Sequence, residues 1–323
     1  MPYNNVISRT DAAALIPEEA AAEILKSVEE TNPLMRLARR LPNMSRAQNR
    51  LPVMSALATA YFVNGDTGLK QTGEVNWTNK YIDAEEVAVI VPISEAVLSD
   101  SEFDIWGEVK PELVKAINNA INAAVLYGTN IPASWTTNLG AAGLLARCTA
   151  AGHTLSLAAY ADAYEAILGE TAAGVDGIYM SVEGDGFQVN GVMAHPSVKG
   201  ILRNLRDSNG NPIFKSAVQD PTRYELDGAP LYFPTDGSMV AASSLLFAGD
   251  WSQLVYAMRQ DITYKVLDQA VIQGADGSII YNLAQQDMVA LRAVIRLGFA
   301  LPNPINAMNA TEATRLAFAA LTA

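Results

Sequence analysis

Few residues of this sequence have the types and spacing that catalysis requires. The chain has two histidines, His153 and His195, which excludes a metal site built from three histidines. His195 precedes Pro196 at the end of an apolar run, and this position favours a structural or surface role over a general base. The motifs GxxxxGK(S/T), HExxH, GxSxG and GxGxxG are all absent. Nucleotide-binding and hydrolase functions therefore lose their main support.

One segment has the oxygen-bearing side chains of a calcium loop. It is Asp207-Ser-Asn-Gly-Asn-Pro212, in which such side chains alternate. Pro212 stands where a calcium loop needs glycine, and Val218 stands where it needs a bidentate glutamate. The segment is therefore predicted to be a turn that follows a helix. Neighbouring carboxylates such as Glu85 and Glu86 point to different faces of a strand, so we expect them to be solvated. We expect no catalytic residue, no metal and no cofactor.

The single cysteine and the charge distribution exclude two further classes of protein. Cys148 has no partner for a disulfide or a CxxC site, and we expect it to be inert. The net charge of −12 argues against a protein that binds nucleic acid with its whole surface. No acidic residue occurs from Thr31 to Gly65, a stretch that holds five arginines: Arg36, Arg39, Arg40, Arg46 and Arg50. A basic N-terminal arm therefore precedes an acidic body.

Length and composition describe a folded chain with more than one packing unit. The chain has 323 residues, of which 50% are hydrophobic and 17% are charged. No apolar run approaches the roughly 20 residues that a membrane-spanning helix needs. The first ten residues have neither a basic start nor an apolar core, so we expect no secretory signal.

The N-terminal quarter is predicted to form an arm and a long hairpin. Residues 11–30 have apolar residues at helical spacing, and a second short helical pattern covers residues 34–41, where Arg36, Arg39 and Arg40 lie. Between residues 51 and 84, two β-like runs flank turn residues. Half of these residues, extended at about 3.3 Å each, reach some 50 Å, which is too far to be covered by one domain. Tyr61, Phe62, Trp77 and Tyr81 on this projection are therefore expected to contact a partner.

The rest of the chain is predicted to mix helices and strands in an α+β fold. A strand at residues 85–94 precedes a long helix at Phe103–Tyr127, which kinks or begins at Pro111. The other expected helices are Leu157–Gly169, a segment between Pro196 and Arg206, and a small helix in the tail at residues 311–323. The other expected strands are Gly177–Met180, Leu226–Tyr232, Leu245–Gly249, Leu254–Met258 and Met288–Gly298.

Short segments from one end of the chain to the other follow the order and spacing of a known family. They are Ile16-Pro17-Glu18-Glu19, Pro33-Leu34, Pro92-Ile-Ser-Glu-Ala-Val-Leu-Ser-Asp100, Ala123-Ala-Val-Leu-Tyr-Gly128, Val192-Met-Ala-His-Pro196, Leu226-Asp-Gly-Ala-Pro230, Gly249-Asp-Trp-Ser-Gln253 and Arg292-Ala-Val-Ile-Arg-Leu-Gly298. In this order they resemble the major capsid proteins of tailed bacteriophages, which have the Hong-Kong-97-type capsid fold.

The resemblance implies a role for each segment of the chain. Residues 1–46 would be the N-terminal arm, and residues 47–84 the extended loop that lies over a neighbouring subunit. Residues 85–135 and 283–310 would form the peripheral domain with its spine helix, and residues 136–282 the axial domain. Residues 311–323 form a tail without an implied role. Arg36, Arg39, Arg40, Tyr61, Phe62, Lys70, Trp77 and Tyr81 would then contact other subunits.

The function that follows is structural. The chain would self-assemble as hexamers and pentamers in an icosahedral head shell around double-stranded DNA, bound without sequence specificity. It would meet a portal and separate scaffolding or decoration proteins, assemble in the host cytoplasm without a membrane, and reside in the virion capsid. The alternative is the shell of an encapsulin-type nanocompartment that encloses cargo protein. An enzyme is the third hypothesis, and it would need a site built from Asp, Glu, Lys and Tyr.

The sequence departs from the family pattern in two places. It begins at the arm, without the long N-terminal extension that serves some members as an internal scaffold, so any scaffold would be a separate protein. Other members weld their subunits through a loop lysine, a last-strand asparagine and a nearby glutamate. Lys70 or Lys80 supplies an amine here, but the corresponding last-strand residues are Asp287 and Val294. The resemblance therefore implies a shell without covalent welding.

Overall fold

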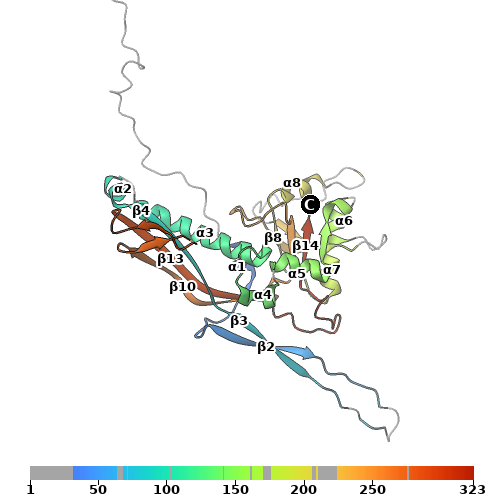
Figure 1. Cartoon of the computed structure of the whole chain (residues 1–323). Coiled ribbons are helices and arrows are strands. Elements are labelled where there is room, and N and C mark those ends of the chain that lie inside the picture. The colour runs from blue at the N-terminus through green and yellow to red at the C-terminus, as the bar shows by residue number, and fades with distance from the viewer. Residues whose placement is uncertain are drawn as a thin grey trace, which may run out of the picture.

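The computed structural model describes residues 32–63, 68–70, 72–101, 104–140, 142–160, 162–169, 176–205, 209, 224–274 and 276–323. The helix predicted over residues 11–30 lies outside these residues, as does the turn at Asp207–Pro212 apart from Asn209. Figure 1 shows two bodies joined by the long helix α3 (Ile105–Tyr127), with a hairpin that projects away from both.

The first body is a four-stranded sheet in the order β1-β10-β13-β4. Its strands are β1 (Arg39–Arg40), β10 (Val255–Leu267), β13 (Met288–Ala300) and β4 (Glu85–Ser94). The central strand β13 runs antiparallel to both long neighbours, and the short β1 runs parallel to β10. The short helices α1 (Pro33–Leu37) and α2 (Glu95–Asp100) lie beside this sheet (Figure 1).

Helix α3 packs along one face of this sheet because one side of the helix is apolar. Leu113, Ile117 and Ile121 are buried in the core that the helix shares with β13. Asp104 begins the helix, since its carboxylate accepts a hydrogen bond from Gly107 N at 3.1 Å. Gly128 ends it with a φ of 68°. The helix begins at Ile105 and continues through Pro111, so it does not begin at the proline.

The second body is a six-stranded sheet in the order β5-β14-β9-β6-β8-β7. Its strands are β5 (Thr154–Ser156), β14 (Phe318–Thr322), β9 (Leu246–Gly249), β6 (Gly191–Ala194), β8 (Ala229–Tyr232) and β7 (Tyr224–Leu226). The helices around it are α5 (Gly143–Ala151), η2 (Leu157–Ala159), α6 (Ala163–Leu168), α7 (Ile178–Gly184), α8 (Val198–Asn204) and η3 (Trp251–Gln253). Helix α4 (Ala133–Leu139) contacts α5 but packs on β13 and β3. Strands β6 and β9 are fully buried, so this sheet is the centre of the core.

Two separate hairpins complete the described fold. Strands β2 (Gln48–Ala56) and β3 (Asn76–Asp83) pair antiparallel and form the projecting hairpin of Figure 1. Strands β11 (Val271–Gln273) and β12 (Ile279–Asn282) form a small second hairpin. The predicted strand at residues 85–94, the predicted hairpin between residues 51 and 84 and the predicted helix after Pro196 are confirmed.

Four local expectations beyond the N-terminal arm are wrong. Residues 177–180 begin helix α7, because Ile178, Tyr179 and Val182 share the buried side of a helix. The tail is strand β14 and not a helix. The helix expected at Leu157–Gly169 is interrupted, since Asp162 caps a new helix by accepting hydrogen bonds from two backbone amides. The strand expected at Leu226–Tyr232 is broken by a turn at Asp227 and Gly228 into β7 and β8. The strand expected at Leu254–Met258, in contrast, is confirmed as β10 and continues to Leu267.

Candidate assembly interface

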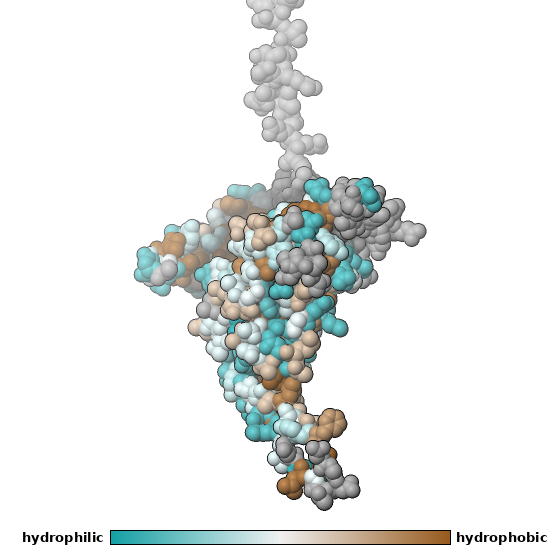
Figure 2. All heavy atoms as spheres, turned by 90° about the vertical axis from the view of Figure 1, so that its right-hand side faces the viewer, coloured by the Kyte–Doolittle hydropathy of each residue, from teal (hydrophilic) through white to brown (hydrophobic). Residues whose placement is uncertain are grey.

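The projecting hairpin exposes apolar side chains far from the core. Phe62 is fully exposed, and Tyr61, Trp77 and Tyr81 are 58%, 66% and 41% exposed. Leu69, which the sequence did not single out, is 91% exposed and lies next to the exposed Lys70. Figure 2 shows apolar atoms on this projection below the body. Apolar surface of this kind marks a place where a protein partner binds.

The root of the hairpin, in contrast, is held firmly by the body. Trp135 Nε1 and Asn138 Nδ2, both on α4, donate hydrogen bonds to the carbonyl oxygens of Asp83 and Tyr81. Gly298 on β13 lies so close that an added Cβ would be 2.4 Å from Asp83 O. Lys80 Nζ donates a hydrogen bond to Glu312 at 2.6 Å and thereby lowers the pKa of that carboxyl. The hairpin is therefore held by contacts at its base, and its apolar side chains beyond the base are exposed.

The three arginines of the arm have no acidic partners among the described residues. Arg36 is on α1, with its Cζ 5.2 Å from the ring centroid of Tyr232. The sequence predicted that Arg39 and Arg40 lie on a helix. This prediction is wrong, because both residues lie on β1. The helix ends because Ala38 is extended and Arg39 N donates to Leu254 O. Within the described part of the chain, no carboxylate lies within 4 Å of any of the three. Arg40 donates a hydrogen bond to Asn43 Oδ1 at 3.2 Å.

The residues that correspond to the welding positions have the following places. Asp287 is exposed in the turn before β13, with a φ of 46°, and its carbonyl accepts from Glu95 N. Val294 is buried in the middle of β13 and offers no group that accepts a proton. Lys70 is exposed, whereas Lys80 is occupied by Glu312.

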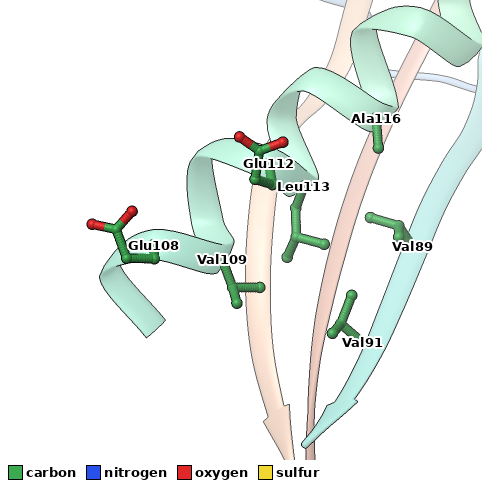
Figure 3. Close-up of a pocket in the computed structure, with 7 residues that line it drawn as sticks. All are labelled: Val89, Val91, Glu108, Val109, Glu112, Leu113 and Ala116. Atoms are coloured by element: carbon green, nitrogen blue, oxygen red, sulfur yellow. The ribbon is translucent and has the colours of Figure 1, made fainter. Parts of the chain in front are cut away.

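A groove beside α3 offers no nucleophile. It has a volume of about 480 Å³ and lies between α3 and β4. Figure 3 shows Val109, Leu113 and Ala116 facing Val89 and Val91, with the carboxylates of Glu108 and Glu112 directed away from the valines. The groove contains no nucleophile beside a base. Its apolar side chains are suited to packing between α3 and β4.

The other candidate residues have structural roles. Cys148 is buried, which raises the pKa of its thiol far above its usual value. His153 contacts Phe318 O through Nδ1 and Asp185 Oδ2 through Nε2. His195 accepts from Ser197 N in a turn. Among the described residues, no group of three potential ligands surrounds a metal site, and no helix is both long and apolar enough to cross a bilayer.

The sequence matches the model of the phage capsid family over residues 12–310. The chain belongs to the phage capsid family. It is 23% identical over 299 residues to the major capsid protein of Staphylococcus phage 80alpha, covering 91% of this chain and 84% of the relative. It is 22% identical over 286 residues to a probable major capsid protein, gp17 of Mycobacterium phage D29, covering 87% and 85%.

Solved structures agree with this assignment. A chain from Microbacterium phage Oxtober96 superposes with a TM-score of 0.81 at 33% identity, covering 98% of this chain and 99% of that one. A chain from Mycobacterium phage Adephagia gives 0.80 at 29% identity, covering 98% of each chain. A capsid chain of a native GTA particle shares the fold at 0.64 and 15% identity, with 98% of each chain covered.

The expected family, fold and function are confirmed. This capsid protein has the Hong-Kong-97-type α+β fold and is a structural subunit of the phage virion shell. Shell assembly from copies of the same chain follows from the capsid structures that it matches. No comparison favours the nanocompartment alternative.

Proposed function

We propose that this capsid protein closes its shell by laying the projecting hairpin over a neighbouring copy. The single observation that carries this proposal is a firmly rooted hairpin whose apolar side chains have no core of their own. Burying a large apolar side chain stabilises a contact by about 1.5–3 kcal/mol. Tyr61, Phe62, Trp77 and Tyr81 supply the apolar contacts, and Lys70 lies beside them.

Each segment of the chain then has its own structural role in the assembled shell. Residues 1–46 are the arm and 47–84 the extended loop, while 85–135 with 283–310 form the peripheral domain. Residues 136–282 form the axial domain around the centres of hexamers and pentamers, and the tail at 311–323 supplies a strand to the same sheet. The protein itself catalyses no reaction and needs no cofactor or metal.

The shell encloses double-stranded DNA without sequence specificity. A net charge of −12 supports this, because an acidic lining repels phosphate and lets DNA pack without adhering. A portal and a separate scaffolding or decoration protein complete the set of partners.

The experiment removes the tip of the hairpin, which holds Tyr61, Phe62 and Leu69, and keeps strands β2 and β3. Gly73 lies beside Thr59, so residues 60–72 can be replaced by an Asn-Gly turn without disturbing β2, β3 or Lys80. The subunits should fold and melt normally, and shell yield in electron micrographs should fall about tenfold or more. Val240→Ser with Met308→Ser, which removes exposed apolar groups from the body, is the matched control. Shells at wild-type yield from the shortened hairpin would refute the proposal.

The arm is proposed to contribute ionic contacts between subunits. Arg39→Glu with Arg40→Glu should preserve secondary structure and melting, because both side chains are exposed. Shell yield should fall sharply, since every equivalent contact in the shell repeats the loss. If the arginines bind only DNA, empty shells will form normally and packaging alone will fall. Wild-type yields of empty and filled shells would leave only a solvated role for these residues.

A further inference from the structure

A small pocket lies where the hairpin root meets the segment between β13 and β14. It has a volume of about 170 Å³, with one wall from β2 and β3 and the other from residues 303–315. Ile305 N donates a hydrogen bond to Met54 O at 3.4 Å, so the two walls also contact each other. The polar part of the lining consists of Ser55, Thr78, Lys80, Asn303, Glu312 and Arg315.

Arg315 is the most buried charged residue of this lining, at 3% exposed. Its Nη1 donates a hydrogen bond to Asn309 O at 2.8 Å, and its Nη2 donates one to Asn303 O at 3.0 Å. Its Nε is buried and has no hydrogen-bond partner among the described residues, and no carboxylate there lies within 4 Å of the guanidinium. Buried charges in proteins are normally paired with an opposite charge. The guanidinium of Arg315 therefore lacks a counter-ion in direct contact.

The other charges near the pocket leave this positive charge in place. Lys80 and Glu312 lie 2.6 Å apart and neutralise each other. The hydrogen bond from Lys80 is the main cause of the lowered pKa of the Glu312 carboxyl, and the positive charges of Arg315 and Arg147 lower that pKa further. Asp185 is the other carboxylate that acts on Arg315, and its two oxygens already accept hydrogen bonds from the segment between β13 and β14.

We propose that this pocket binds a small tetrahedral oxyanion of the phosphate class, with Arg315 as the main charged contact. The donors of the lining come from different directions, since the hydroxyls of Ser55 and Thr78 belong to the hairpin and the guanidinium belongs to the opposite wall. A tetrahedral anion offers acceptor oxygens in all of these directions, and hydrogen bonds to a charged donor are the strong ones. The site is independent of any contact between the hairpin and a neighbouring copy.

The size of the pocket selects a free anion. A water molecule occupies about 30 Å³ in the liquid, so about 170 Å³ accommodates a tetrahedral oxyanion together with some water. Pockets for larger organic ligands begin at roughly 300 Å³, so a nucleotide does not fit. An anion bound between the two walls would connect the hairpin root to the segment before β14 and hold both more firmly.

Phosphate binding to full-length subunits tests the proposal, with sodium phosphate compared to sodium chloride at equal ionic strength. In wild-type subunits, millimolar phosphate should broaden the phosphorus NMR signal and raise the melting temperature by about 2 °C or more. Arg315→Met should abolish both effects. Lys110→Met, which removes an exposed charge on α3, is the matched control and should retain both. Equal melting shifts in wild type and Arg315→Met would identify a general effect of phosphate on protein stability and overturn the proposal.

A second variant remains informative if Arg315→Met fails to fold. Glu312→Gln removes the negative charge from the pocket but can still accept a hydrogen bond from Lys80, so the affinity for phosphate should rise about threefold or more. A purely structural role of Arg315 predicts no such gain. Phosphate should also slow hydrogen exchange of the backbone amides around Val53 and Thr78. Unchanged affinity in Glu312→Gln, protection confined to another part of the chain, or water in place of an oxyanion in density maps of phosphate-soaked shells would overturn the inference.

Discussion

At the scale of single residues, Trp135 links the hairpin root to the body. Its ring is 2% exposed and meets Phe299 edge-on at a centroid distance of 5.6 Å, while Nε1 donates to Asp83 O at 2.9 Å. One side chain thus joins α4, β13 and the last residue of β3. The indole combines a large buried surface with a bond to the hairpin root.

Trp135→Ala should therefore destabilise the subunit by about 3–5 kcal/mol, the usual cost of deleting a large buried aromatic. Trp135→Phe keeps most of the packing and loses the hydrogen bond, so about 1–2 kcal/mol is expected. Urea unfolding of isolated subunits measures both changes. Equal stability of Trp135→Ala and wild type would show that the root is held by other contacts.

Residue-level prediction from the sequence succeeded where the signal was local. The exposure of Tyr61 and Trp77 follows from an apolar pattern beside turn residues, and both are exposed. Lys80 and Glu312 are 232 positions apart in the sequence, so no local spacing of residues predicts that they pair. The unpartnered Nε atoms of Arg292 and Arg296 likewise became visible only when the sheet register was known.

At the scale of elements, errors arose where tertiary pairing overrides local pattern. The tail was expected to be a helix, but β14 lies between β5 and β9, and Phe318 and Ala320 are fully buried there. Alanine-rich segments favour helix in isolation, yet small side chains also fit a crowded central strand. Arg39 and Arg40 became a strand for the same reason, because β10 offered unpaired backbone groups. The long, strongly periodic elements, β4 and α3, were predicted correctly.

Removing residues 316–323 should abolish folding of the second body. The deletion would separate β5 from β9 and expose Leu246, Phe247 and Ala248, which are fully buried. We expect an insoluble product or loss of protection from hydrogen exchange across β9 and β6. Deleting only the half-buried Thr322 and the exposed Ala323 is the control and should be tolerated. A soluble, protected product from the longer deletion would mean that β14 is dispensable.

At the scale of the whole molecule, the shell should be held by non-covalent contacts. An aspartate is a poor acyl donor without activation, and Val294 provides no base for Lys70 or Lys80. Mature particles boiled in detergent should therefore migrate as single chains on a denaturing gel. A ladder of covalent oligomers would show that another set of residues performs the welding reaction.

The position of β14 also has a consequence for biosynthesis. Its residues pair with β5, more than 160 positions earlier in the chain, and with β9 on the other side. The sheet therefore cannot close until the ribosome has translated residues 318–322, although the hairpin and α3 emerge long before. Contacts between such distant segments also form slowly. The exposed apolar side chains of the hairpin are therefore synthesised before the second body can fold, and we expect chaperone binding during translation to raise the yield of folded subunits.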